Sequence, residues 1–275
     1  MSHRGQLTPI ELVNVLYKEK PIRNNKVNQF AQFSVLSILL FVSMLSHSNN
    51  VFLDHGEAVS RAMSAFYMFG ASQGETRYKV EYEKELNIAE QALLKLQKKE
   101  APFAARLMKN WAQLRPRLVY NFDEYSGYYV AGQTQGEFRG YLNRYYTEYS
   151  NKQYQYSNKA ERLQHTQVLI EIVLARFFDL ASSPIPDNQG FGAIQPVIDV
   201  KVIVKMIKKN LQVLEKYSVG NVYHSDIKNV VTKWNFIESS VLNSQKQPVI
   251  LLIYYNKKRI IHLLDKSKQK LIAKK

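Results

Sequence analysis

A tyrosine-rich stretch with interleaved arginines is the most chemically distinctive part of this sequence. Residues 120–156 contain 10 of the chain's 18 tyrosines. Tyrosine combines an apolar ring with a polar hydroxyl, and arginine can hold an anion through two hydrogen bonds. On a helix, i, i+3, i+4 and i+7 spacing places side chains on one face. We therefore predict a binding face for a small anionic ligand or a protein partner, made of Arg139, Tyr141, Arg144, Tyr145 and Glu148.

The same stretch has a second interpretation. An aromatic-rich helical core whose hydroxyls reach solvent would have the same composition, because a tyrosine ring packs well while its hydroxyl stays hydrated. The residue types alone leave both interpretations open.

No pattern typical of catalysis or cofactor binding occurs elsewhere in the sequence. Cysteine is absent, which excludes thiol nucleophiles, disulfides and cysteine-ligated metal sites. None of the six histidines lies at i, i+4 from another, and no glycine-rich phosphate loop or Gly-x-Ser-x-Gly elbow occurs. We therefore expect a non-enzymatic protein with no catalytic residues, no cofactor and no metal site.

Asp54, His55 and Glu57 form the densest cluster of acidic and histidine residues in the chain. Acidic side chains are favourable at the beginning of a helix, where they meet unpaired backbone N–H groups. We expect this cluster to cap the first helix after the apolar segment described next.

An uncharged segment near the N-terminus indicates a membrane anchor. No Asp, Glu, Lys or Arg occurs between Lys26 and Asp54, and the most apolar part runs from Phe30 to Leu45. A spanning helix needs about 20 mainly apolar residues, so this core is a little short, and we expect residues 27–48 to cross a bilayer with Asn28, Gln29 and His47 at its two interfaces. No second spanning segment follows in this sequence.

The charges before this segment indicate its orientation. Residues 1–26 carry five basic and two acidic residues, which favours a cytoplasmic N-terminus and export of the remainder. The expected location is thus the bacterial inner membrane, with one crossing and most of the chain in the periplasm. A signal peptide cleaved after Ser48, or a buried core helix of a cytosolic protein, are the alternatives.

Hydrophobic periodicity predicts an all-α fold for the rest of the chain. Sparse Gly and Pro, at 11 and 8 residues, also favour long helices over a turn-rich β fold. Ser182–Pro196 is the clearest loop. We expect helices over Val51–Ala71, Glu75–Gln97, a segment beginning at Pro102, a long helix from Gln135 to Ala181, and Val197–Tyr217, Ser225–Asn243 and Pro248–Ile272.

A faint internal repeat suggests two duplicated helical modules in an elongated bundle. Ser64–Ser72 resembles Ala175–Ser183, and Leu107–Val119 resembles Asn229–Val241. The resulting domain prediction is a basic cytoplasmic N-terminus (1–26), a transmembrane anchor or signal segment (27–48), a first helical module (49–134), and a second module with a long connecting helix and a basic C-terminal tail (135–275).

One N-terminal crossing followed by paired helical modules resembles the layout of the sensing part of bacterial chemoreceptors. The resemblance rests on layout over residues 27–265 and on no motif, and the chain lacks the second membrane helix and signalling domain of that family. It implies a sensor-like or partner-binding envelope protein. The net charge of +15 is also compatible with a cytoplasmic protein that binds nucleic acid, although a membrane-spanning segment at residues 27–48 would disfavour it. An envelope enzyme is a third alternative. The sequence does not indicate an oligomeric state.

Overall fold

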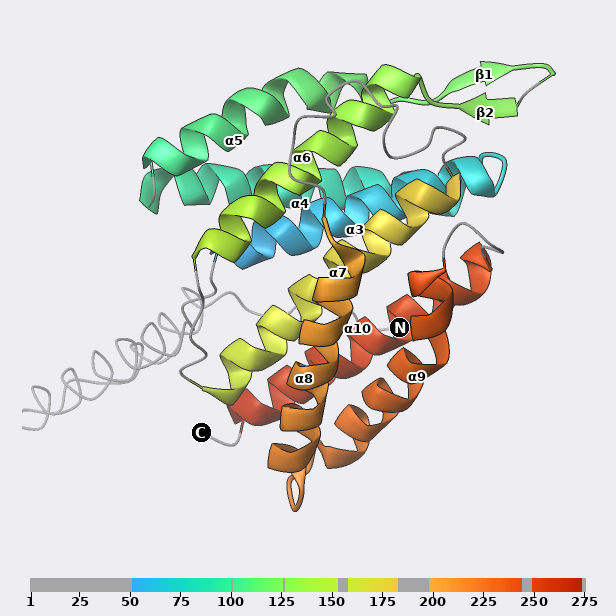
Figure 1. Ribbon diagram of the computed structural model, residues 1–275. Helices are drawn as coiled ribbons and strands as arrows, with labels where there is room; N and C mark the ends of the chain where they lie inside the picture. Colours follow the sequence, from blue (N-terminus) through green and yellow to red (C-terminus); the bar gives the residue numbers. More distant parts are fainter. Residues whose placement is uncertain are drawn as a thin grey trace, which may run out of the picture. The chain divides into compact units, whose positions relative to one another are not determined.

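The protein is mainly α-helical in the computed structural model, as its periodicity predicts. The structure describes residues 51–99, 101–125, 127–152, 158–182, 198–243 and 249–273. The helices are α3 (Val51–Ala71), α4 (Thr76–Lys99), α5 (Ala101–Leu114), α6 (Gly132–Asn151), α7 (Lys159–Ser182), α8 (Val200–Ser218), α9 (His224–Leu242) and α10 (Ile250–Ala273), shown in Figure 1.

A short 3₁₀ helix and a β-hairpin separate α5 from α6. The 3₁₀ helix spans Arg115–Arg117, where Pro116 cannot continue the α-helical hydrogen bonding. Strands β1 (Asn121–Asp123) and β2 (Gly127–Tyr129) then pair antiparallel, with Phe122 opposite Tyr128. This hairpin is not among the elements expected from the sequence, because strands of three residues are too short to establish a period-2 pattern.

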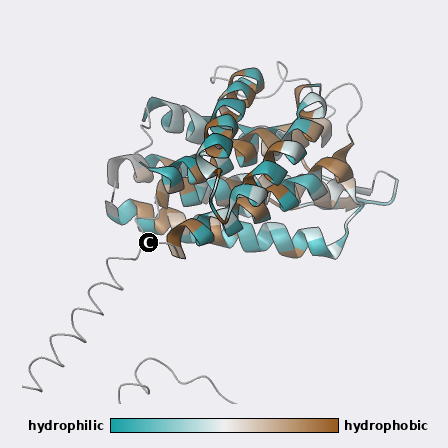
Figure 2. Ribbon diagram, turned by 90° about the horizontal axis from the view of Figure 1, so that it is seen from below, coloured by the Kyte–Doolittle hydropathy of each residue, from teal (hydrophilic) through white to brown (hydrophobic). Residues whose placement is uncertain are grey.

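Helices α3 and α7 pack against each other at the centre of the compact unit that extends from Asn49 to Lys275. Both are buried around most of their circumference. Ala58, Ala62 and Ala65 give α3 a small cross-section, which lets neighbouring helices approach closely. The remaining helices are amphipathic, and Figure 2 shows hydrophobic and hydrophilic residues alternating around them.

The helices form two sets with the same order of packing. In α3–α6 and in α7–α10, each helix packs against the next one in sequence, and the last packs against the first. The predicted repeat pairs α3 with α7 and α5 with α9, so it relates equivalent members of the two sets. Duplication, and a boundary between modules at residues 134 and 135, remain predictions.

The long helix predicted from Gln135 to Ala181 is wrong, because two helices occupy this region. Helix α6 ends at Asn151 and α7 begins at Lys159. Oδ1 of Asn158 accepts a hydrogen bond from the backbone N–H of Glu161 at 3.0 Å, which caps the start of α7. An Asn followed three residues later by Glu is itself a helix-start signal, which the continuous periodicity concealed.

The predicted anchor, residues 27–48, and the N-terminal residues 1–26 lie outside the described residues, and both remain predictions. Among the helices of the described segments, none is both long and apolar enough to cross a membrane.

Gly56 permits the closest approach between α3 and α6. A Cβ atom at this position would lie 2.0 Å from Cζ of Tyr145, whose ring is fully buried and stacks on Phe52. Because neither the ring nor the helix has space to move, Gly56→Ala should lower the free energy of unfolding by about 1–3 kcal/mol. Chemical denaturation measures this. In a Tyr145→Ala background the same substitution should cost clearly less, and equal costs in both backgrounds would contradict the proposed contact.

Candidate ligand-binding pocket

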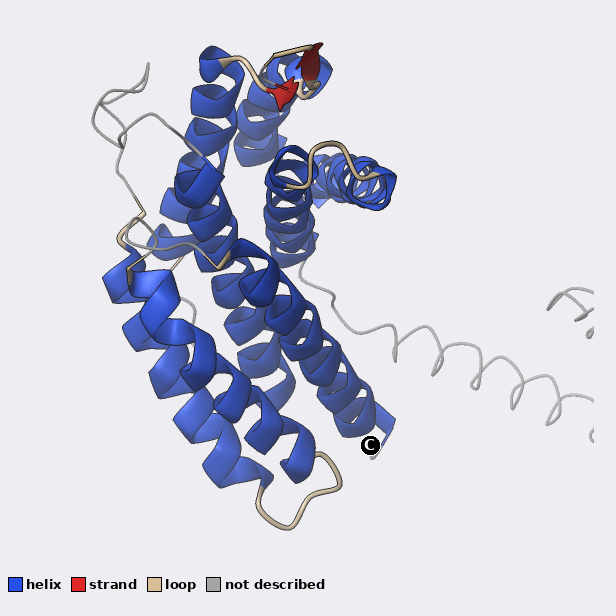
Figure 3. Ribbon diagram, turned by 90° about the vertical axis from the view of Figure 1, so that its right-hand side faces the viewer, coloured by secondary structure: helices blue, strands red, loops and turns tan. Residues whose placement is uncertain are grey.

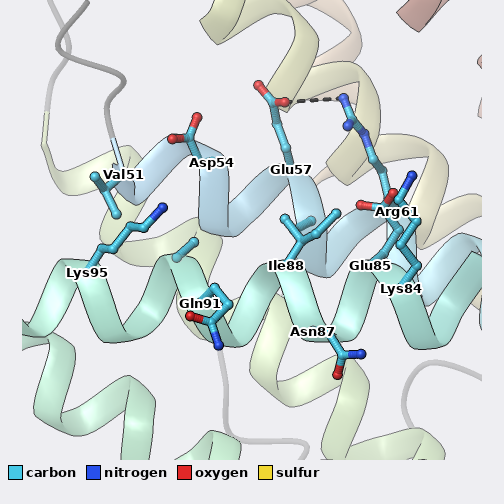
Figure 4. A pocket seen from close by; sticks show the side chains of 12 residues that line it. Val51, Asp54, Glu57, Arg61, Lys84, Glu85, Asn87, Ile88, Gln91 and Lys95 are labelled. Atoms are coloured by element: carbon cyan, nitrogen blue, oxygen red, sulfur yellow. Dashed lines mark hydrogen bonds and ion pairs between the residues drawn. The ribbon is translucent and has the colours of Figure 1, made fainter. Parts of the chain in front are cut away.

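A pocket of about 720 Å³ lies between α3 and α4. Ala58 and Ala92 contribute short side chains to its lining. Figure 4 shows the longer polar and charged side chains of the pocket, among them Asp54, Glu57 and Lys95. Its lining is formed by Val51, Asp54, Glu57, Ala58 and Arg61 from α3, and by Lys84, Glu85, Asn87, Ile88, Gln91, Ala92 and Lys95 from α4.

The spacing of these residues explains how two helices create one polar pocket. Asp54, Glu57 and Arg61 are separated by three and four residues and therefore lie along one side of α3. On α4, Lys84 and Lys95 are three helical turns apart and remain exposed to solvent. Acidic groups thus occupy the protected part of the pocket, and lysines lie at its solvent side.

Among the acidic groups of the pocket, Glu57 has the most strongly shifted pKa. Its side chain is nine-tenths buried, and its Oε2 accepts hydrogen bonds from Arg61 Nη2 at 3.2 Å and Gln167 Nε2 at 3.3 Å. Figure 4 shows the Glu57 carboxylate and the Arg61 guanidinium side by side. The Oε1 atom has no hydrogen-bond partner among the described residues.

Burial raises the pKa of Glu57 to about 8. The positive charges of Arg61 and Lys268 oppose this increase, whereas the negative charges of Glu171 and Asp54 add to it. At neutral pH most molecules therefore carry a proton on Glu57.

Glu85 presents a second buried carboxyl group to the same pocket. It is 8% exposed, and its Oε2 also lacks a hydrogen-bond partner in the described part of the chain. Burial raises its pKa, and the negative charge of Glu171 adds to the increase, while Arg61 and Lys257 lower it. Two carboxyl groups with unused hydrogen-bonding capacity thus line one pocket.

A buried ion-pair network adjoins the pocket and shares Arg61 with its lining. Oε1 of Glu171 accepts a hydrogen bond from Arg61 Nε at 2.8 Å, and Oε2 of Glu171 lies 2.8 Å from Lys257 Nζ. Glu171 and Lys257 are 1% and 4% exposed. Burial lowers the pKa of Lys257, while the charge of Glu171 raises it. The network joins α3, α7 and α10, and it fixes the guanidinium that holds Glu57.

The five residues predicted as a binding face have different environments. Arg139 donates two hydrogen bonds to the buried carboxylate of Asp179, at 2.7 and 3.0 Å. Tyr141 and Tyr145 are in the core, and the Tyr145 hydroxyl donates to the Phe52 carbonyl at 3.0 Å. The remaining two, Arg144 and Glu148, lie nearer the surface, where Glu148 pairs with Arg106. The structure therefore does not gather these residues around one opening, and Tyr141 and Tyr145 match the aromatic-core interpretation.

Asp54 lies in the first turn of α3, as expected for an acidic residue at a helix start, whereas the expectation that His55 and Glu57 also cap this helix is wrong. His55 lies inside α3 and is fully buried: its Nδ1–H donates to the Ala89 carbonyl at 2.8 Å, and its Nε2 accepts from the Tyr141 hydroxyl at 2.8 Å. The sequence does carry a signal for the buried charges of this helix. Glu57 and Arg61 lie at i, i+4 spacing within a largely apolar segment, which is typical of a buried polar network.

Within the described segments, no group of three or more histidine and acidic side chains is arranged to hold a metal ion. Comparisons with family models, curated proteins and solved structures find no match to this chain.

Removing one member of the buried ion pair should destabilise the fold. Lys257→Met leaves the Glu171 carboxylate with one cation fewer in a nonpolar environment, so the free energy of unfolding should fall by about 3–5 kcal/mol. The exposed neighbour Lys258 pairs with Glu81 at the surface, and Lys258→Met should cost at most about 1 kcal/mol. Urea denaturation of both variants makes the comparison. Equal losses would show that Lys257 contributes no more than a surface lysine.

Acid should destabilise the protein through two buried histidines. Burial lowers the pKa of His55 and His165 to about 4, below the ordinary value of 6.5. The unfolded chain therefore binds protons at these two positions first as pH falls, so the contribution of the two histidines to stability is complete above pH 6.5 and declines towards pH 4. His55→Gln with His165→Gln should flatten this decline in denaturation midpoints, whereas His262→Gln, at an exposed position, should not. An unchanged slope in the double variant would refute the assignment.

Proposed function

We propose that this chain is a non-enzymatic binding protein whose α3–α4 pocket holds a small molecule. The supporting observation is that Glu57 and Glu85, both about nine-tenths buried, line the same pocket, and that among the described residues each has one buried carboxyl oxygen without a hydrogen-bond partner. An unsatisfied buried polar group costs about 1–3 kcal/mol, so a ligand that donates hydrogen bonds to these atoms would recover that cost.

The distribution of charge favours a zwitterionic ligand such as an amino acid. An ammonium group bound beside Glu57 and Glu85 would offer hydrogen bonds and positive charge to these two carboxyl groups, and it would favour the ionised form of Glu57. The anionic end of such a ligand would then face Lys84 and Lys95 at the solvent side of the pocket. This proposal modifies the sequence-based expectation of a small anionic ligand, because the protected groups are acidic.

The proposed cellular setting is the envelope, with residues 27–48 as a membrane anchor and the helical unit outside the cytoplasm. Its support is the uncharged segment and its basic flank. A ligand-binding helical unit carried on one anchor suits a sensor-like protein that acts through a partner.

Binding of amino acids should depend on both glutamates. In isothermal titration calorimetry of the purified chain with a panel of amino acids, Glu57→Gln and Glu85→Gln should each weaken binding at least tenfold, about 1.4 kcal/mol. Glu90→Gln, an exposed position on the same helix, should leave the affinity unchanged. Because the ligand's ammonium group binds ionised Glu57, affinity should rise with pH up to about 8, and Glu57→Gln should abolish this dependence.

The proposal would be rejected by an affinity that is insensitive to both glutamate substitutions, because the ligand would then bind elsewhere. It would also be rejected by chemical conversion of the ligand. A carboxyl group protonated near neutral pH is also what a general acid needs, which is the observation that favours an enzyme. Mass spectrometry of the ligand after incubation distinguishes the two: a binding protein returns it unchanged, and a converted product would support the enzyme.

A further inference from the structure

A row of lysines follows the outer face of α8. Lys201, Lys205, Lys209 and Lys216 are exposed and lie within about one quarter of the helix circumference, given 100° per residue. The opposite side buries the apolar residues of the helix, Ile203, Val204, Ile207, Leu211 and Leu214. The row, here termed the α8 lysine row, extends over about 22 Å along the helix axis.

These four lysines differ from the basic residues of α10. Acidic groups of other helices pair with four cations of α10: Lys257 with Glu171, Lys258 with Glu81, and Lys266 and Lys270 with Asp226. In the described residues, no ion pair is formed by any member of the α8 lysine row, and only Lys208 of this helix pairs with an acid, Glu238. The positive charge of α8 is therefore available to an external anion, whereas that of α10 is largely neutralised.

The turn between α8 and α9 adds exposed apolar side chains at the end of this row. Tyr217, Val219 and Val222 are 51%, 66% and 63% exposed. Gly220 has a φ of +75°, and a Cβ atom built there would meet no atom within 4 Å, so the turn projects into solvent. Figure 3 shows this turn at the end of the helical unit opposite the β-hairpin.

Lysines beside a projecting apolar turn fit an anionic lipid surface better than a nucleic acid. Lysine stems can lie along a bilayer while their ammonium groups contact lipid phosphates, and tyrosine favours the membrane–water interface. The exposed valines of the turn can enter the headgroup region, but their side chains offer a duplex neither charge nor hydrogen bonds.

We propose that α8 and the α8–α9 turn dock the protein onto an anionic phospholipid bilayer. The α8 lysine row lies along the headgroups, and Tyr217, Val219 and Val222 enter the interface at its end. This inference rests on the surface of α8 and does not depend on the α3–α4 pocket.

The test must report on α8 itself, because residues 27–48 are separately predicted to enter a membrane. The chain has no cysteine, so Gln212→Cys, an exposed position on the side of the lysine row, can carry a single environment-sensitive fluorophore. A second probe at Ser150→Cys on α6 is the reference. The full chain is titrated with phosphatidylcholine vesicles and with vesicles that also contain phosphatidylglycerol. Only the probe on α8 should shift to the blue, and only with the anionic vesicles.

Substitutions then separate a defined surface from general charge. Each lysine near an anionic bilayer should contribute roughly fivefold to partitioning, so replacing Lys201, Lys205, Lys209 and Lys216 by Gln should weaken vesicle binding at least tenfold. A control with the same change in net charge replaces exposed residues of α4, α5 and α10 by Gln, namely Lys79, Lys98, Lys109 and Arg259. Its affinity should stay within about twofold of the original. Val219→Ser with Val222→Ser should also weaken vesicle binding, with no change in affinity for duplex DNA.

Three results would overturn the proposal. One is an unshifted α8 probe in anionic vesicles, a readout that needs no substitution in the lysine row. Another is an equal loss of binding in the lysine-row variant and its charge-matched control. The last is tighter binding to duplex DNA than to anionic vesicles with the same lysine dependence, which would assign α8 to nucleic acid instead.

Discussion

The arrangement of this fold depends on the buried charge network formed by Arg61, Glu171 and Lys257. An ionised group inside a protein is stable only when opposite charges and hydrogen bonds replace the water it has lost. Glu171 satisfies that requirement with one cation from α3 and one from α10, at 2.8 Å each. The three helices must therefore keep one relative placement, since sliding any of them by a residue would leave a buried charge without its partner.

The α3–α4 pocket is a consequence of the same network. Arg61 is shared between Glu171 and Glu57, so it neutralises neither completely, and burial still raises the pKa of Glu57. The network reaches Glu57 through only one of its oxygens, and among the described residues neither the other oxygen of Glu57 nor Oε2 of Glu85 has a hydrogen-bond partner. The core thus ends at this point in acidic groups with unused bonding capacity, which lowers stability as long as no donor meets them.

Local sequence patterns predict most of the helices, because each amphipathic segment encodes its own buried face. The beginning and end of α3 were predicted to the residue, and α8, α9 and α10 to within a few residues. The break between α6 and α7 was missed because the apolar periodicity continues through it, while the capping by Asn158 depends on one side chain. The pocket was not predictable in this way. Whether Tyr141 and Tyr145 point inward, and whether Arg61 meets both Glu57 and Glu171, is decided by the packing of α3 against α6 and α7, which lie far from it in the sequence.

The formal charge of +15 is not evenly distributed, because folding uses the acidic residues internally. Glu171, Asp179 and Asp226 are nearly or fully buried, and each pairs with cations from other helices. An acid paired in this way neutralises its own partner cation and is no longer available to offset a lysine elsewhere on the surface. Among the described residues, the acids that pair with a lysine do so with lysines of α10 or with Lys208. The four lysines of the α8 row therefore face solvent and form a positive strip. The strip therefore results from the positions of the paired acids, and the composition alone does not show which face of the protein carries the positive charge.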